Sequence, residues 1–286
     1  AKFVARVELT SRVLLTISIL ISLAILPNIQ VIASMHAFFE SSVVVVYVWS
    51  FFKRGWLTAP IRLTTITQIL KSSLPFSTVA VMMAVNGNID STLFRWLTDT
   101  HETGLYAATN RLGLIALFGV SVVFSSVLPM LGRVLRRSIS EYEAIFGSIA
   151  RVICSAGLPL TTIFTLLAPD ISRLIFGAEF AAAWRGLSLY GAYMLIVAMN
   201  MLLSSNLAIR SPARTYACAT AASLCLNIVT AAAGIYFPYR YFGEGAASAG
   251  RLLAGISCDM ISMMLFLWLE PGRIDRRNLF WNFLLA

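Results

Sequence analysis

The stretch Leu187–Ala208, LSLYGAYMLIVAMNMLLSSNLA, contains no charged residue and decides the class of fold. A helix that crosses the hydrocarbon core of a bilayer needs about 20 consecutive apolar residues, because that core is about 30 Å thick. A helix in the core of a soluble protein rarely reaches this length without a polar face. Since a bilayer offers no water to the backbone, a continuous apolar run has to form a helix. We therefore expect residues 187–208 to span a membrane.

Seven further apolar stretches of similar length lie along the chain, and together they predict an all-α polytopic membrane protein with about eight transmembrane helices. The chain is 58% hydrophobic and 12% charged, and its mean hydropathy of +0.81 excludes soluble globular and disordered classes. Membrane β-barrels show short segments of alternating polarity, which these continuous runs do not. The other stretches are Val4–Leu26, Val31–Phe52, Leu74–Leu97, Leu105–Leu131, Ile145–Leu167, Tyr216–Phe237 and Ala246–Leu269.

The basic residues between these stretches fall mostly into alternate gaps. Of the 22 Lys and Arg residues, 16 lie in the N-terminal flank or in gaps on the same side as that flank. The opposite gaps hold three, Arg173, Arg185 and Arg240, and three more lie in or beside the stretches, Arg95, Arg111 and Arg251. Because basic residues favour the cytoplasmic side, we expect both ends of the chain to be cytoplasmic. The net charge of +9 thus reflects the orientation of the chain in the membrane, and we expect no nucleic-acid partner.

The gaps are too short for an extramembrane domain. We expect residues 53–73 to be a cytoplasmic linker, in which Ile61–Leu70 forms an amphipathic interfacial helix anchored by Trp56. On the opposite side, Pro169-Asp170 and Gly177 predict the start and the stop of a short surface helix. The chain opens on Ala1-Lys2-Phe3 without a Met or a signal peptide, and we expect it to begin partway through a longer protein.

The sequence carries no recognisable catalytic motif. It has no H-E-x-x-H, no G-x-S-x-G and no Walker A pattern, so we expect neither an enzyme nor a bound cofactor. The four cysteines lie in apolar stretches without a C-x-x-C and are interpreted as packing residues. His36 and Glu40, spaced i, i+4, could form half of a metal site, but we favour a local polar pair and expect no metal.

Five ionisable residues lie at membrane depth: Glu40, Asp90, Arg111, Arg251 and Asp259. A charge at the bilayer centre costs at least about 2.5 kcal/mol, so these side chains should face the protein interior or an aqueous cavity. The two arginines lie in the outward half, where the orientation rule does not explain them, and an anionic ligand in a cavity would. Structural ion pairing, for example of Asp90 with Arg111, is the alternative, and both interpretations stay open for each residue.

Three asparagines also lie at or near membrane depth: Asn200, Asn206 and Asn227. Buried amides usually connect helices, and contact with a ligand is the second interpretation.

Several short motifs within residues 70–269 resemble those of prokaryotic polysaccharide flippases. These flippases belong to the multidrug/oligosaccharidyl-lipid/polysaccharide exporter superfamily. Asn88–Asp90 (NID) followed by Thr103–Arg111 (TGLYAATNR) resembles the family's D … G-x-Y-x-x-A stretch. Lys71–Pro75 (KSSLP) is similar to the L-x-x-S-L-P start of the family's seventh helix.

The resemblance continues in the same order toward the C-terminus. Phe124–Pro129 (FSSVLP) resembles the family's lfP helix ending, and Ala168–Tyr190 resembles its a-x-x-i-x-x-l-l-f-G-x-x-f-x-x-a element. Asn227 followed by Gly243–Ala247 (GEGAA) is similar to the N … G-x-x-G-A-A junction between the eleventh and twelfth helices. Each motif is short, and their joint order over residues 70–269 carries the resemblance.

Family members have twelve helices in two six-helix lobes. The resemblance implies that residues 1–52 are the last two helices of a first lobe, 53–73 the linker, and 74–286 a complete second lobe with a cytoplasmic tail. It also implies a multi-pass protein of the bacterial inner membrane that flips a polyprenyl-diphosphate-linked oligosaccharide for O-antigen, exopolysaccharide or capsule synthesis. Its partners would be this lipid, the bilayer and polysaccharide assembly proteins.

The resemblance suggests roles for the residues at membrane depth. Arg111, Arg251 and Asn227 are candidates for binding the diphosphate headgroup, because guanidinium groups pair well with phosphate. A gradient of H⁺ or Na⁺ would drive transport, and the candidate ion acceptors are Asp90, Glu40 and Asp259.

Four alternatives remain. A multidrug or cation antiporter of the same superfamily would share the architecture but would line its cavity with acidic residues. A lipid II flippase would share the cavity chemistry. A membrane-embedded polysaccharide polymerase or ligase would need a larger outer loop than residues 168–186, and an assembly subunit without transport activity is a further possibility.

Overall fold

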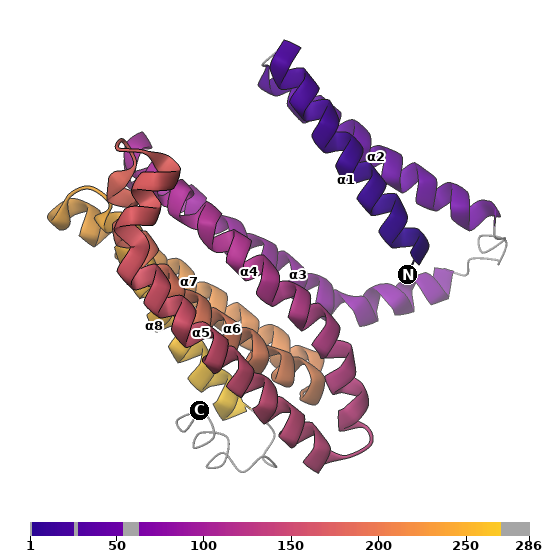
Figure 1. Cartoon of the computed structure of the whole chain (residues 1–286). Helices are drawn as coiled ribbons and strands as arrows, with labels where there is room; N and C mark the ends of the chain where they lie inside the picture. Colours follow the sequence, from indigo (N-terminus) through magenta and orange to yellow (C-terminus); the bar gives the residue numbers. More distant parts are fainter. Residues whose placement is uncertain (1, 26–27, 54–62, 270–286) are drawn as a thin grey trace. The chain divides into compact units, whose positions relative to one another are not determined.

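The computed structural model describes residues 2–25, 28–53 and 63–269, and within these ranges the chain is helical without a strand, which confirms the all-α prediction. Figure 1 labels the helices. Their bounds are α1 Lys2–Ile25, α2 Ile29–Lys53, α3 Leu63–Leu97, α4 Thr100–Leu135, α5 Ile139–Phe176, η1 Ala181–Ala183, α6 Trp184–Arg210, α7 Ala213–Phe242 and α8 Ala246–Leu269. The anchor Trp56 and the C-terminal tail fall outside the described residues.

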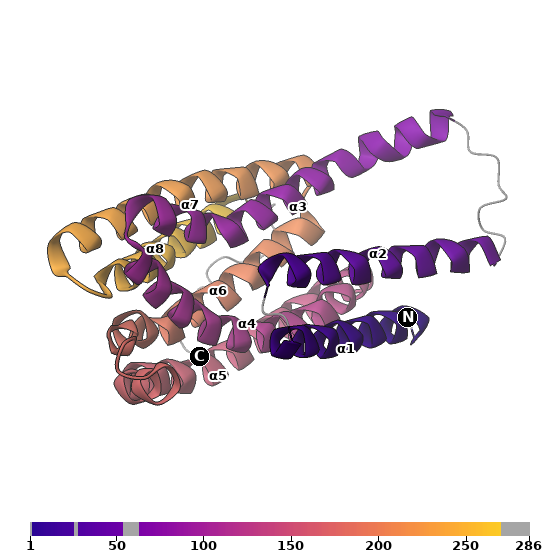
Figure 2. The same cartoon turned by 90° about the horizontal axis from the view of Figure 1, so that it is seen from above.

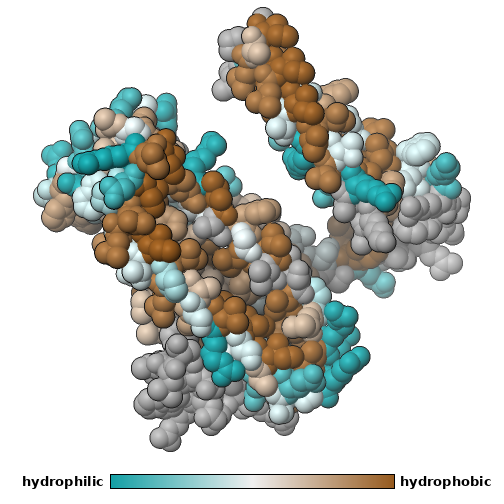
Figure 3. Space-filling model, viewed as in Figure 1, coloured by the Kyte–Doolittle hydropathy of each residue, from teal (hydrophilic) through white to brown (hydrophobic). Residues whose placement is uncertain are grey.

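Seven of the helices are long and apolar enough to cross a membrane, so the chain is a multi-pass membrane protein. They are α1, α2 and α4 to α8. The expected eighth span, α3, is not among them, although it is a continuous helix of 35 residues. The count of eight is therefore not confirmed. Figure 3 shows apolar side chains along the helix faces of the α3–α8 part and hydrophilic ones gathered mainly at its two ends.

The chain divides into two compact units, residues 1–71 and 72–286, with the division inside α3. In the first unit α1 and α2 form a hairpin, and Arg12 donates to the Glu40 carboxylate between them. The second unit contains the rest of α3 and the helices α4 to α8. Figure 2 shows α7 and α8 lying side by side in this unit, and they are in extensive contact.

Two helix boundaries differ from the sequence prediction. Residues 63–70 form no separate interfacial helix, because they are the first turns of the continuous helix α3. Likewise Pro169 does not begin a new helix: α5 runs through both Pro159 and Pro169. Prolines are tolerated inside membrane helices because neighbouring groups satisfy the freed backbone carbonyls. Gly177 ends α5 with a φ of 77°, as predicted, since glycine adopts this left-handed region without a steric cost.

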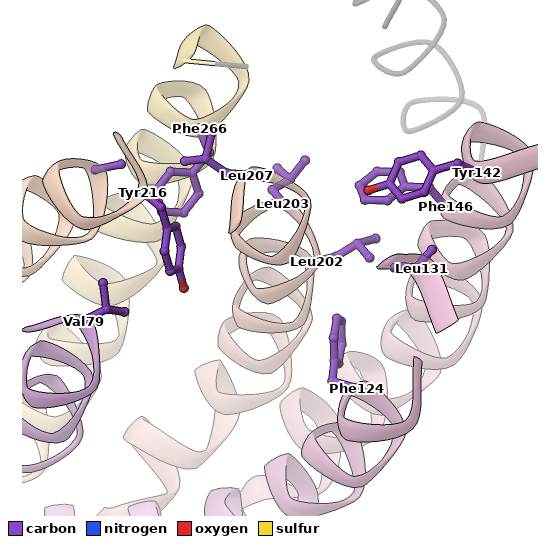
Figure 4. Packing of buried hydrophobic residues seen from close by; sticks show 11 residues of the cluster. Val79, Phe124, Leu131, Tyr142, Phe146, Leu202, Leu203, Leu207, Tyr216 and Phe266 are labelled. Carbon is purple, nitrogen blue, oxygen red and sulfur yellow. The ribbon is translucent and has the colours of Figure 1, made fainter. Parts of the chain in front are cut away.

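The largest core cluster of the second unit joins α5 to α6 and α6 to α7 and α8. Figure 4 shows Tyr142 and Phe146 of α5 facing Leu202 of α6, with Tyr216 and Phe266 on the far side of α6. The hydroxyl of the fully buried Tyr142 donates to Asn206 Oδ1, so this asparagine connects two helices. Such interhelical hydrogen bonds contribute about 0.6–2 kcal/mol in membrane proteins.

Small residues set the distance between α7 and α8. Ala246, Gly250 and Ala254 recur at spacing four on α8, a pattern that lets helices approach closely in lipid. A Cβ atom on Gly250 would collide with the Gly234 carbonyl of α7, and one on Gly234 would come within 2.5 Å of Ala254 Cβ. This close contact of the two backbones brings the polar side chains of α7 and α8 within reach of each other.

Candidate functional site

A buried ion pair lies inside the second unit, between α3 and α8. The Arg251 side chain is 3% exposed, and its Nη2 lies 2.8 Å from Asp90 Oδ2, whose side chain is 15% exposed. The same Nη2 donates to Asn227 Oδ1 of α7 at 3.1 Å. The guanidinium group of α8 thus contacts the neighbouring helix α7 and the helix α3, which is distant in sequence.

Further hydrogen bonds fix the two partners of Arg251. Asn227 Nδ2 donates to Asn86 Oδ1 at 2.7 Å, and the Tyr106 hydroxyl of α4 donates to Asp90 Oδ2 at 3.1 Å. Asn86 and Asp90 share one face of α3 because they are spaced i, i+4. The Tyr106 ring stacks on Phe94 with a centroid distance of 4.1 Å, which holds the hydroxyl toward the carboxylate. We call Asn86, Asp90, Tyr106, Asn227 and Arg251 the polar cluster.

The polar cluster contains hydrogen-bonding atoms that are buried but not paired. Asp90 Oδ1, Arg251 Nε and Arg251 Nη1 have no hydrogen-bond partner among the described residues. Nη1 lies against Gly255 of α8 and beside the Tyr193 ring of α6, where a Cβ on Gly255 would be 2.6 Å from Nη1 and 2.8 Å from the ring. A buried donor without an acceptor costs about 1–3 kcal/mol or more for a charged group. The cluster therefore has unused capacity to bind an acceptor.

A second polar pair lies further along the interface of α6 and α8. Asn200 Nδ2 of α6 donates to Asp259 Oδ1 of α8, and Asn200 Oδ1 is buried without a partner among the described residues. Asp259 follows Arg251 by eight positions, which corresponds to about 12 Å along a helix. The contacts between α6 and α8 therefore include a carboxylate at some distance from the guanidinium.

The N-terminal end of α8 is held by contacts to α4 and α6. The buried Glu102 of α4 accepts a hydrogen bond from the Gly245 backbone N–H, and Arg185 Nη1 of α6 donates to the carbonyls of Phe242 and Glu244. Tyr239 of α7 donates to Asp99 Oδ2 at 3.3 Å. These bonds fix the turn between α7 and α8, and thereby the position at which α8 presents Arg251.

Five of the six candidate site residues named from the sequence occupy three different settings. Asp90, Asn227 and Arg251 meet in the polar cluster, whereas Asp259 pairs with Asn200. Glu40 lies in the first unit, bonded to Arg12 and 3.8 Å from His36 Nε2, so it is part of a local polar group there. The described residues contain no group of three His, Cys, Asp or Glu side chains suited to a metal ion.

Arg111 differs from Arg251 in its surroundings. Its side chain is exposed on α4, and no hydrogen bond or ion pair joins it to another described residue. The alternative in which Asp90 pairs with Arg111 is wrong, because Asp90 pairs with Arg251. Sequence reasoning also did not assign Asn86 and Tyr106 to a site, although the i, i+4 spacing of Asn86 and Asp90 indicated a shared helix face.

A search against protein-family models, curated proteins and solved structures found no match to this chain. The chemistry of the polar cluster is therefore inferred from its own residues.

Proposed function

We propose that this chain is a membrane transporter that moves a polyprenyl-diphosphate-linked oligosaccharide across the bacterial inner membrane for surface polysaccharide synthesis, with both ends in the cytoplasm. The observation that supports the proposal is the buried guanidinium of Arg251, which has two nitrogens without an acceptor among the described residues of a membrane-spanning bundle. A diphosphate headgroup supplies the anionic acceptors that such a group binds.

The physical demands of this substrate match the surroundings of Arg251. Moving a diphosphate across the hydrocarbon core requires a cation held inside the protein, because an unpaired charge there is costly. Asn227, which already contacts Arg251, offers an amide for hydrogen bonds to the phosphate or the sugar. The exposed Arg111 is a second cation available at the surface of the second unit. The polyprenyl tail can remain in lipid while the headgroup moves.

Transport against a gradient needs an energy source, and we propose that an H⁺ or Na⁺ gradient supplies it. Asp90 pairs with Arg251, Asp259 interacts with Arg251 electrostatically, and Glu40 is the candidate in the first unit. Alternating access in such transporters occurs by rocking of helix bundles about a site near the membrane midplane.

A cation antiporter is the second candidate, and one observation favours it. Asp259 is hydrogen-bonded to an amide, and within the described residues no cation lies at ion-pair distance from it. A partly buried carboxylate of this kind could bind a cationic drug. The two functions are separated by testing cells for raised tolerance to cationic dyes, and for its loss with Asp259→Asn.

The flippase proposal is tested with the protein in proteoliposomes that contain a polyprenyl-diphosphate-linked saccharide, whose transfer between leaflets is followed by accessibility to an added hydrolase. We expect Arg251→Gln to lower the transfer rate at least about tenfold, since a hydrogen bond to a charged group contributes about 1.5–3 kcal/mol. Arg240→Gln, at an exposed position near the end of α7, is the matched control and should transfer at the wild-type rate. A lipid II substrate in the same vesicles distinguishes the two flippase classes.

Arg251→Gln leaves Asp90 without its cation, so a loss of activity could reflect unfolding. The double variant Asp90→Asn/Arg251→Gln removes both charges and keeps the site neutral. If this double variant folds and transfers the lipid at the wild-type rate, the proposal is wrong.

A further inference from the structure

Asp90 and Arg251 are joined by a single contact between one oxygen and one nitrogen. Nη2 of Arg251 contacts Asp90 Oδ2 and Asn227 Oδ1, while Nε, Nη1 and the second carboxylate oxygen have no partner among the described residues. An Arg–carboxylate pair of full strength uses two parallel hydrogen bonds. The observed pair is thus weaker than the same residues could form, and Arg251 can be shared with another anion.

We propose that Asp90 and the anionic ligand compete for Arg251, so that a proton bound by Asp90 releases the guanidinium for the ligand. This inference rests on the proposed function and concerns the regulation of the same site: Asp90 controls the affinity for the ligand, and the carboxylates that remain to couple transport to the ion gradient are Asp259 and Glu40. When Asp90 is ionised, the pair is neutral and the ligand has to displace a carboxylate. When the carboxylate takes up a proton from solution, its negative charge is lost and Arg251 carries an uncompensated positive charge. Ligand release and deprotonation of Asp90 restore the original pair.

The other groups around Asp90 do not replace it in this role. Tyr106 of α4 donates to its Oδ2, and Tyr190 and Tyr193 of α6 interact electrostatically with both Asp90 and Arg251. Asn227 of α7 is an amide and does not titrate. The remaining carboxylate in electrostatic range, Asp259 of α8, is hydrogen-bonded to Asn200 rather than to Arg251.

Competition for Arg251 has a thermodynamic consequence. Because linkage is reciprocal, a proton that favours ligand binding has to be bound more tightly in the presence of the ligand. Anion binding should therefore take up protons, and lowering the pH should raise the affinity for the anion. Coupling between two sites of this kind typically amounts to about 5–150-fold in affinity.

The experiment uses the purified protein in detergent and inorganic pyrophosphate as the probe, with calorimetry in two buffers that differ in their heat of ionisation. We expect wild type to take up protons on binding. Asp90→Asn should bind pyrophosphate at least about fivefold more tightly than wild type at neutral pH, with fewer protons taken up. Free pyrophosphate carries the same protons in both titrations, so a difference between the two proteins arises at the binding site. Asp170→Asn, an exposed carboxylate of α5, is the control and should match wild type.

Asp90→Asn leaves Arg251 buried without its anion, so a second variant is needed in case Asp90→Asn misfolds. Tyr106→Phe keeps the stacking on Phe94 but removes a hydrogen bond that holds Asp90 Oδ2 beside Arg251. It should raise the affinity for pyrophosphate about two- to fivefold in the same direction.

The outcomes separate this inference from the function on which it rests. If binding depends on Arg251 but neither Asp90→Asn nor Tyr106→Phe tightens it, the competition is wrong while the anion site stands. If wild type and Arg251→Gln bind pyrophosphate equally, or if wild type does not bind it, both the anion site and the competition are overturned.

Discussion

Asp90 Oδ2 of α3 lies 2.8 Å from Arg251 Nη2 of α8, and both side chains are enclosed by the helices of the second unit. The two helices are held in place by separate contacts, since α3 packs through Phe94 against Tyr106, and α8 packs closely on α7 at Gly250. The packing of the bundle therefore brings the two charges together, and the ion pair in turn stabilises the bundle. Its contribution to stability can be separated from its role with a ligand.

Removing one member of the pair should destabilise the protein more than removing both. Arg251→Ala leaves a buried carboxylate without compensation, for which we expect a loss of about 3–5 kcal/mol in the free energy of unfolding. The double variant Asp90→Asn/Arg251→Gln should regain most of this loss, because no uncompensated charge remains. The measurement is unfolding of the purified protein in a denaturing detergent titration. Arg95→Ala on the exposed side of α3 is the control, and an equal effect of Arg95→Ala and Arg251→Ala would contradict this account.

The absence of a side chain at Gly255 makes room for the guanidinium. A Cβ atom there would lie 2.6 Å from Arg251 Nη1 and 2.8 Å from the Tyr193 ring, so Gly255→Ala should displace both groups. Overpacking of this kind costs about 1–3 kcal/mol. Gly147→Ala on α5 is the matched control, because nothing lies within 4 Å of its added Cβ, and it should be neutral or stabilising by up to about 1 kcal/mol. Thermal unfolding of the two variants measures the difference, and similar melting shifts would count against the crowding of Arg251.

The helices themselves could be predicted well from the sequence. The apolar stretch Leu187–Ala208 lies within α6, Trp184–Arg210. A long apolar segment in a bilayer forms a helix because its backbone groups have to form hydrogen bonds within the segment. The boundary at Pro169 could not be predicted, since the effect of a proline depends on neighbouring groups that satisfy the freed carbonyl. The polar residues Asn86 and Asp90 lowered the hydropathy of α3 without preventing a continuous helix.

Three members of the polar cluster could be predicted from the sequence, but the contacts between them could not. Charged residues at membrane depth indicate buried contacts, and this led to Asp90, Asn227 and Arg251. Which residues meet depends on the order in which the helices pack and on how each helix is rotated about its axis. The spacing of residues along one helix contains no information about either. For this reason Asp90 was as compatible with Arg111 on the adjacent helix as with Arg251 on a distant one.

Of the two glycines in the turn before α8, Gly245 should be more sensitive to substitution than Gly243. Gly243 and Gly245 both have a positive φ, 76° and 73°, so an alanine at either position is strained by about 1–3 kcal/mol. At Gly245 the added Cβ would also collide with the Ala182 carbonyl, whereas nothing lies within 4 Å at Gly243. Gly245→Ala should therefore lower the melting temperature clearly more than Gly243→Ala. Equal shifts would mean that strain alone governs this turn.

The orientation proposed from the basic residues can be tested by labelling. The four cysteines, Cys154, Cys218, Cys225 and Cys258, are first replaced by serine. A cysteine is then placed at exposed Ser140, beside Arg136 and Arg137, or at exposed Glu179, between α5 and α6. Because basic segments favour the cytoplasm, a membrane-impermeant maleimide should label Glu179→Cys in intact cells and Ser140→Cys after permeabilisation.

The same pair of positions provides its own control, since both should react in permeabilised cells. The two sites lie at opposite ends of α5, whose 38 residues extend about 57 Å as a helix, which exceeds the thickness of the hydrocarbon core. A span of this length places its two ends on opposite sides of the bilayer. Labelling of Ser140→Cys but not of Glu179→Cys in intact cells would reverse the orientation, and the cytoplasmic assignment of both chain ends would then be wrong.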